Sequence, residues 1–150
     1  MTPFKLHIMP KYNIIKKENK DAIYRLQVRA ELADELYEKI LRKLIVEKKY
    51  KDPDYSAKQL AIELETNTRY ISAVINSRFQ QNYSSLVNEY RIREALFLLA
   101  DHRYINKRVE QIGTMVGFAN RQSFYSAFFR VKGMTPKEYR EQQIEKAQKK

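Results

Sequence analysis

The chain has 150 residues, of which 43% are hydrophobic and 31% charged, so it can bury one core and is too apolar to be disordered. Three glycines and four prolines supply few turn signals, which argues against a β-sandwich or β-barrel and favours helices. Lysine and arginine outnumber the acidic residues by 29 to 18, which gives a formal charge of +11. This excess either serves to attract a polyanion or belongs to a solvated lysine-rich surface.

The first segment, residues 1–51, is predicted to be a basic leader followed by an amphipathic helical extension. Apolar side chains recur at every fourth residue in its second half: Leu32, Leu36, Ile40 and Leu44. This spacing is typical of the apolar face of a helix. The stripe, residues 28–49, either packs on the following domain or forms the seam of a homodimer. Pro53 ends the helix, because proline cannot continue one.

Residues 52–150 are predicted to form a helical domain in which one kind of unit occurs twice. Each unit is a short helix, a polar turn and a second helix. Ser56 is an N-cap candidate in the first unit, and Gly117 occupies the place of a left-handed C-cap in the second. A long helix between about residues 84 and 101 joins the units, and Pro136 opens a last short helix. The predicted fold class is all-α, with two helix-turn-helix units joined by a linker helix and an N-terminal helical extension.

The second helix of each unit exposes residue types that a DNA-reading helix needs. A helix-turn-helix places this helix in the major groove, where arginine bonds guanine and glutamine bonds adenine. Nine side chains are predicted to face outward as base-reading candidates: Arg69, Ser72, Ala73 and Asn76 in the first unit, and Arg121, Gln122, Ser123, Tyr125 and Ser126 in the second. The alternative is that they form the ordinary solvent face of a helical bundle.

A second group of side chains lies near predicted helix ends, where phosphate contacts are common. The phosphate-contacting candidates are Ser56, Arg78, Lys107, Arg108, Asn120, Arg130 and Lys132. The basic residues would attract phosphate by charge, and the two polar ones would lie where helix amides are free. Solvated surface side chains are the alternative for each of them.

Residues 113–136, followed by Tyr139-Arg140, closely resemble the C-terminal signature of the AraC/XylS family of bacterial transcription activators. The matching positions are Ile112, Gly117, Phe118, Phe124, Phe128, Gly133, Thr135, Pro136, Tyr139 and Arg140. In the first half, Tyr70-Ile71-Ser72 is similar to the family's Tyr-Leu-Ser, and residues 88–95 are similar to its linker helix. The resemblance covers about residues 52–142.

The resemblance implies two reading helices about one DNA turn apart, which contact successive major grooves of double-stranded DNA. It also implies regulation of transcription, with RNA polymerase as a partner. Ala73 and Ser126 depart from the family, which often has arginine there, and Phe129 replaces a frequent lysine. Gln80 replaces a frequent glycine. Gly113 stands where alanine is usual, which is expected to cost up to ~1 kcal/mol.

These departures leave open the alternative of a helical protein-interaction module that has lost DNA binding. A second alternative, the output tail of a longer sensor protein, follows from the lack of an expected effector pocket in the sequence. No catalytic motif, nucleotide-binding loop or metal-spaced cluster occurs in the sequence, so we expect no enzyme activity, no cofactor and no metal. The chain has no cysteine and no apolar run long enough to span a membrane. The expected location is the bacterial cytoplasm.

Overall fold

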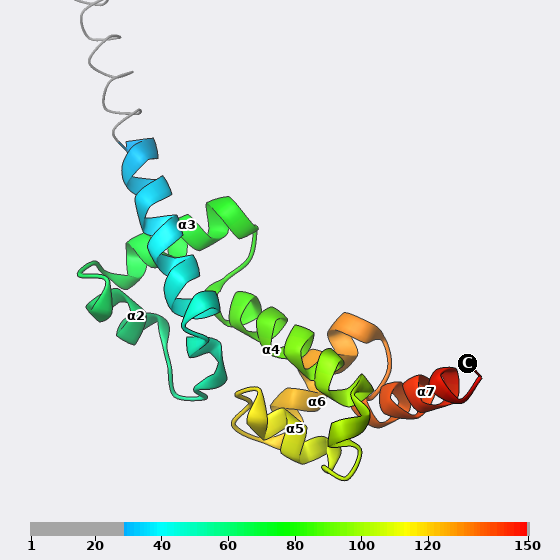
Figure 1. The fold of residues 1–150 in the computed structure, drawn as a ribbon. Coiled ribbons are helices and arrows are strands. Elements are labelled where there is room, and N and C mark those ends of the chain that lie inside the picture. The colour runs from blue at the N-terminus through cyan, green and yellow to red at the C-terminus, as the bar shows by residue number, and fades with distance from the viewer. Residues whose placement is uncertain (1–28, 150) are drawn as a thin grey trace, which may run out of the picture. The chain divides into compact units, whose positions relative to one another are not determined.

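The computed structural model describes residues 29–149, and within this range every regular element is helical, which confirms the predicted fold class (Figure 1). The chain divides into two compact units, residues 1–36 and residues 37–150. The predicted basic leader, together with Val28, lies outside the described residues. The division predicted between residues 51 and 52 stays a prediction.

The N-terminal extension does not form one continuous α-helix up to its proline. An α-helix ends at residue 41, and the π-helix η1 (Arg42–Val46) follows it. Lys48 then has a left-handed backbone with φ of 55°, before the 3-10 helix η2 (Lys49–Lys51). The spacing of the apolar stripe predicted one helix to about residue 49. The break was not predicted, because apolar residues keep nearly the same spacing through a π turn. Ile40, Leu44 and Tyr50 are buried, so the C-terminal part of the stripe belongs to the core.

The first helix-turn-helix unit consists of α2 (Ala57–Glu63) and α3 (Thr68–Phe79). The Ser56 hydroxyl accepts from the Gln59 amide at 3.1 Å, which confirms the predicted cap. The buried residues are Leu60, Ala61, Ile71, Val74 and Ile75. Helical spacing in the sequence also predicts Leu64 and Tyr70 in this core. This is wrong for both: Leu64 is half-buried, and Tyr70 is 60% exposed. Tyr70 precedes buried Ile71 on α3, and its position turns the ring outward.

The linker helix α4 (Tyr83–Ala100) begins and ends within about one residue of the prediction. It packs against α3 of the first unit and against all three helices of the C-terminal half (Figure 1). Its buried residues are Leu86, Val87, Ile92, Ala95, Leu98 and Leu99. One long helix therefore supplies apolar surface to both units and holds them on a common support.

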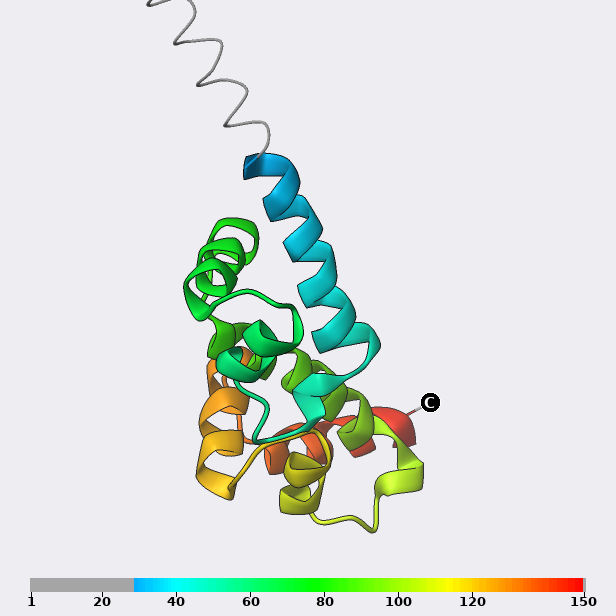
Figure 2. The ribbon, with the colours of Figure 1, turned by 90° about the vertical axis from the view of Figure 1, so that its left-hand side faces the viewer.

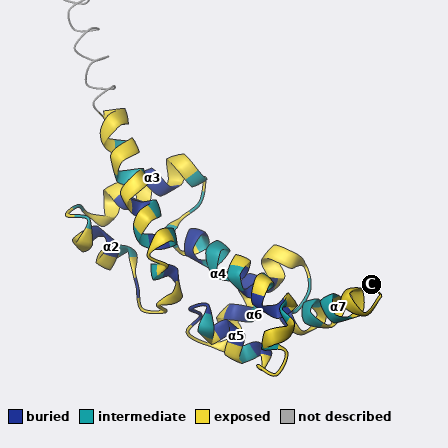
Figure 3. Cartoon of the chain, in the orientation of Figure 1, coloured by how far each residue is buried: buried dark blue, intermediate teal, exposed yellow. Residues whose placement is uncertain are grey.

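The second unit follows the 3-10 helix η3 (His102–Tyr104) and consists of α5 (Val109–Met115) and α6 (Arg121–Lys132). The sequence predicts that Gly133, like Gly117, follows a helix end. Gly117 and Gly133 have φ of 115° and 67°, so both glycines have the positive φ expected there. Pro136 opens α7 (Pro136–Gln148), which is longer than the short helix expected. The core of this half is aromatic, with Phe118, Phe124 and Phe128 buried among residues of α4 and α5. Figure 3 shows the buried stretches (dark blue) on α4, α5 and α6.

Gly113 is a packing glycine, which corrects the expected cost relative to alanine. A Cβ atom at this position would lie 2.5 Å from Phe124 Cδ2 and 2.7 Å from Phe124 Cγ. Side-chain carbons do not approach so closely without displacement, and displacing a buried aromatic ring is unfavourable. The absent methyl group is what lets α5 and the Phe124 ring pack together, and this gain opposes the lower helix propensity of glycine.

Two half-buried arginines, Arg91 of the linker helix and Arg140 of the C-terminal signature region, hold loops in place. Arg91 Nε donates to the Tyr50 carbonyl at 2.6 Å, and its Nη2 donates to the Asp52 carbonyl at 3.1 Å. Arg140 Nη1 donates to the Lys107 carbonyl at 2.6 Å. Burial lowers the pKa of both guanidinium groups. Arg91 and Arg140 are therefore structural residues of this fold.

Candidate nucleic-acid interface

The first candidate face lies on α3 and contains the four predicted residues of that helix. Arg69, Ser72, Ala73 and Asn76 are all exposed. Their spacing of three, four and seven places them on one side of the helix. Ile71, Val74 and Ile75 are buried on the other side, so core packing orients the face. Asn67 starts the helix, because its side-chain oxygen accepts from the Tyr70 amide at 2.9 Å.

The second candidate face lies on α6. Arg121, Gln122, Ser123 and Ser126 are exposed, and Tyr125 is half-buried. The first turn is fixed by Asn120, whose side-chain oxygen accepts from the Ser123 amide at 2.8 Å. Burial of Phe124, Ala127 and Phe128 turns the polar residues outward. In Figure 2, α3 (green) and α6 (orange) both lie at the left-hand side.

A carboxylate of α5 organises the start of the second face. Glu110 Oε1 lies 3.4 Å from Arg121 Nε and accepts from the Tyr125 hydroxyl at 3.2 Å. The Arg121 guanidinium also lies over the Tyr125 ring, 4.6 Å from its centroid. A hydrogen bond from its own backbone amide, then the Tyr125 hydroxyl and the charge of Arg121, hold the pKa of Glu110 below its ordinary value. Arg121 therefore has an internal partner before any ligand arrives.

Sequence reasoning missed Glu110, because Arg121 lies on a different helix, eleven positions later. The contact between Arg121 and Tyr125 had a signal, since residues four apart on a helix are neighbours. Tyr37 was also missed: its ring lies 5.5 Å from the Arg78 guanidinium and 5.3 Å from the Phe79 ring. Helical periodicity marked the stripe around Tyr37 but not its partners on α3.

The phosphate-contacting candidates are all exposed, but several are already engaged. The Ser56 and Asn120 oxygens accept helix amides, which leaves the Ser56 hydroxyl hydrogen and the Asn120 amide group as donors. Arg108 precedes α5, and its backbone amide donates to Gln111 Oε1 at 2.7 Å. The Lys132 ammonium lies 5.5 Å from the Tyr139 ring centroid. Arg130 and Lys107 are exposed basic side chains at the end of α6 and in the loop before α5.

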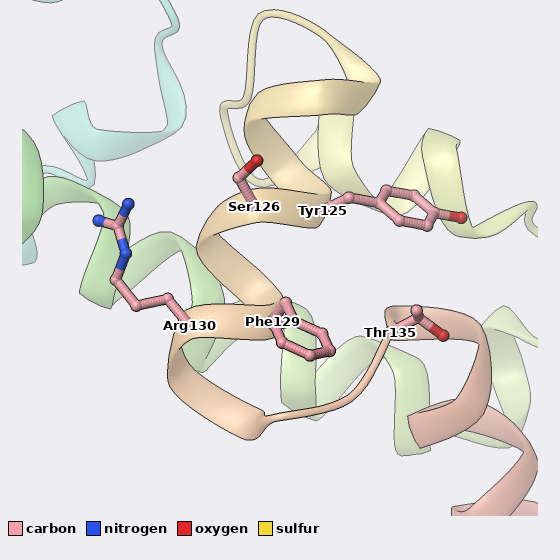
Figure 4. Close-up of a pocket in the computed structure, with 5 residues that line it drawn as sticks. All are labelled: Tyr125, Ser126, Phe129, Arg130 and Thr135. Atoms are coloured by element: carbon pink, nitrogen blue, oxygen red, sulfur yellow. The ribbon is translucent and has the colours of Figure 1, made fainter.

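An open hollow of about 510 Å³ adjoins the second face, near the end of α6 (Figure 4). Its lining residues are Tyr125, Ser126, Phe129, Arg130 and Thr135. Phe129 is 57% exposed although the neighbouring Phe128 is fully buried. The second face therefore combines hydrogen-bonding groups, a cation and an uncovered aromatic ring.

The described part of the chain offers neither a metal-binding cluster nor a membrane-spanning helix. Among residues 29–149, no group of three or more histidine, aspartate or glutamate residues is placed to hold a metal ion. No helix in that range has the length and apolarity needed to cross a membrane. The arrangement instead presents two outward helix faces with arginine, amide and hydroxyl groups, the groups that read base edges in a major groove.

The chain matches a known family by sequence. The family model described as a helix-turn-helix domain matches residues 60–142, more than half of the chain. The match includes most of α2, all of α3 to α6 and the first half of α7. No significant match was found among proteins with curated functions.

Solved structures of bacterial proteins share the fold. The C-terminal domain of a two-component response regulator from Fusobacterium nucleatum is 25% identical, with a TM-score of 0.60 over 69% of this chain and 98% of that one. A transcriptional regulator from Chromobacterium violaceum, of the proteins containing an AraC-type DNA-binding domain, is 25% identical, with a TM-score of 0.52 over 59% and 77% of the chains. A Listeria innocua protein of unknown function is 20% identical, with a TM-score of 0.62 over 70% and 94%.

Proposed function

We propose a function from the family to which this chain belongs, the AraC/XylS family of helix-turn-helix DNA-binding domains. The family consists of DNA-binding regulator domains and is not an enzyme family. In finer detail, the chain binds double-stranded DNA sequence-specifically and regulates transcription in the bacterial cytoplasm. The two helices α3 and α6 each enter a major groove and read base edges, and the chain has no catalytic activity.

The observation that carries this proposal is the equivalence of the two candidate helices. Both α3 and α6 have 12 residues, begin after an asparagine N-cap and end at a residue with left-handed backbone. Both bury one side and expose arginine, amide and hydroxyl groups on the other. A protein that reads two successive grooves needs two such helices of matched length on one support, and α4 contacts both of them.

Within this proposal the side chains have different roles. Arg69 and Gln122 occupy the same position in α3 and α6, and both can form paired hydrogen bonds with a purine. Asn76 and Arg121 extend the faces toward the end of α3 and the start of α6. Serine hydroxyls and Ala73 fit closely against bases. The exposed basic residues at the helix ends, such as Arg130, contact phosphate and set the register.

The proposal is tested by selection from a pool of random duplexes with the intact chain, at low and at physiological salt. A reader of DNA enriches a motif. Its affinity falls as salt rises, because the release of the same counterions into a more concentrated salt solution gains less free energy. The motif should have two parts about one helical turn apart. The rival function, a protein-interaction module that kept the scaffold, predicts no duplex binding even at low salt.

Replacement of Gln122 by alanine tests the reading role of α6. We expect a loss of about 1–3 kcal/mol at one base position, with other positions unaffected. Gln142→Ala, at an exposed glutamine of α7, is the matched control and should leave the motif unchanged. An equal loss on every duplex would assign Gln122 to general affinity instead of reading.

Two partners remain part of the proposal: RNA polymerase and a second copy of the chain through residues 28–49. Within that stripe Leu32 is 59% exposed, whereas Ile40 and Leu44 are fully buried in the chain itself. A homodimer can therefore use only the N-terminal part of the stripe without unfolding. Sedimentation of the intact chain and of Leu32→Lys distinguishes the states, since a dimer that depends on the stripe should dissociate in the variant.

A further inference from the structure

The aromatic ring of Phe129 has no role in the core and lies on the outward side of α6. It is 57% exposed, and Phe128 beside it is completely buried. An exposed phenylalanine leaves apolar surface in water, which is unfavourable in the free protein. In Figure 4 the ring projects into the hollow together with the side chains of Tyr125 and Thr135.

Phe129 completes a row of side chains along the second face. Arg121, Tyr125 and Phe129 follow each other at intervals of four, so they lie above one another on one side of α6. The upper part of the row is ordered, because the Arg121 guanidinium lies 4.6 Å from the Tyr125 ring centroid and Glu110 contacts both residues. The parallel row, Gln122, Ser126 and Arg130, is polar and exposed.

The chemistry of the major groove restricts what an apolar ring in this row can recognise. Base edges in the groove present hydrogen-bond donors and acceptors, which phenylalanine cannot satisfy. Thymine alone adds a methyl group at C5, and apolar side chains contact it. The adjoining cation of Arg130 attracts the phosphate chain beside the groove, so the charge around the hollow favours DNA as the occupant over an apolar peptide.

We infer that Phe129 is a specificity-determining residue that selects a thymine by contact with its C5 methyl group, at a base pair beyond those read by Gln122. This inference rests on the proposed function, since it needs α6 in the major groove. The distance along the helix between positions 122 and 129 is about 10 Å, or roughly three base-pair steps. The selected thymine should therefore lie two to four base pairs from the position that Gln122→Ala relaxes.

The test replaces each thymine of the selected duplex, one at a time, by deoxyuridine. This change removes only the methyl group and keeps the pairing edge. With the intact chain, the replacement of one particular thymine should weaken binding roughly three- to five-fold, as measured by fluorescence anisotropy. This is the loss expected for one buried methyl group. Phe129→Ala should bind thymine and deoxyuridine equally at that position, while Phe129→Leu, which keeps an apolar group, should retain part of the preference.

Phe97→Ala is the matched control, because Phe97 is a 65% exposed phenylalanine on α4, outside both reading helices. It should retain the full preference for thymine. If no thymine is sensitive, or if Phe129→Ala keeps the preference, the inference is overturned while motif-specific binding still supports the proposed function. If no duplex binds at low salt, both fail. A dimer of the free chain that Phe129→Ala dissociates would overturn the inference, since the ring would then contact a second copy.

Discussion

The two helix-turn-helix units use the same framework with different packing. The fifth residue of the first helix and the fourth of the second are Ala61 and Ile71 in one unit, and Gly113 and Phe124 in the other. A larger ring on one helix is matched by a smaller residue on its neighbour. Helix length, caps and orientation can therefore be kept while side-chain volume in the core is redistributed between facing positions.

The units also differ in how they make their left-handed turns. The residue after the C-cap of the first helix is Glu65 in one unit and Gly117 in the other, and the second helices end at Gln80 and Gly133. Residues with a Cβ atom adopt positive φ at a cost of roughly 1 kcal/mol. The first unit therefore carries conformational strain that the second avoids.

The largest effect is expected for Gly117→Ala. A Cβ atom would lie 2.4 Å from the Tyr50 carbonyl oxygen, and φ of 115° is unfavourable for alanine. The free energy of unfolding should fall by about 2–5 kcal/mol, the sum of overpacking and backbone strain. Glu65→Gly, at the equivalent place in the first unit, should instead raise it by about 1 kcal/mol. Urea unfolding measures both free-energy changes. A change of the same sign in both variants would contradict the proposed difference in strain between the units.

Gly113→Ala should lower the free energy of unfolding by about 1–3 kcal/mol, although helix propensity alone predicts a gain. The reason is the short distance from the new Cβ to the Phe124 ring. Adding Phe124→Ile reproduces the packing pair of the first unit and should recover part of the loss caused by the alanine. A double-mutant cycle measures this coupling. Additive effects would show that the two positions pack independently.

Exchange of the helix C-caps should change the two units in opposite directions. Gly133→Ala should cost about 1 kcal/mol through its backbone alone, because no atom lies within 4 Å of the added Cβ. Gln80→Gly should gain about the same amount, since φ at Gln80 is 57°. Thermal unfolding of the two single variants measures these changes. A loss of stability in both would mean that the Gln80 side chain stabilises the fold by more than its left-handed backbone costs.

The two units differ in charge at the second residue of their first helices, which is Lys58 in α2 and Glu110 in α5. Glu110→Gln keeps an acceptor for the Tyr125 hydroxyl but releases Arg121 from its counter-charge. Duplex affinity should rise about two- to four-fold at low salt, and less at high salt. Lys58→Gln should lower it slightly. An unchanged affinity in Glu110→Gln would show that Arg121 does not approach DNA.

The smallest effect concerns alkaline pH and Tyr83, the first residue of the linker helix α4. Burial raises the pKa of Tyr83 to about 12, with Arg91 opposing and the charges of Asp52 and Glu63 adding to the shift. Because the folded pKa exceeds the unfolded value near 10, this stabilising contribution is complete below pH 10 and is lost as the pH rises through 12. At pH 11 the loss should be less than about 1 kcal/mol. Unfolding of Tyr83→Phe should depend less on pH over this window, whereas parallel profiles would contradict the assignment.

Local signals predicted the helix boundaries well, because a cap depends on a few neighbouring residues. Ser56, Gly117, Gly133 and Pro136 act where the sequence places them. The outward set on α3 could also be predicted, since periodicity identifies the opposite, buried side. The exposure of Tyr70 was missed because its helical spacing groups it with the core residues Ile71 and Val74, whereas it lies at the edge of the buried side.

Contacts between helices could not be predicted from spacing. The sign of the Gly113 effect depends on where the Phe124 ring lies on the facing helix, and the engagement of Arg121 depends on Glu110 of α5. Both are tertiary distances that no local pattern encodes. The resemblance to a family indicated which helices matter, and the structure added the partners that hold or free each side chain on them.

The bonds from Arg91 to the Tyr50 and Asp52 carbonyls have a practical consequence for transplanting this domain into chimeric regulators. The acceptors precede α2, and the same stretch lies against Gly117, in the turn of the second unit. A graft that starts at residue 52 would discard Ile40, Leu44 and Tyr50 and leave a half-buried cation without its acceptor at Tyr50. Such a truncation would therefore weaken the second unit, although that unit is the more distant one in sequence. A functional graft should begin no later than residue 37.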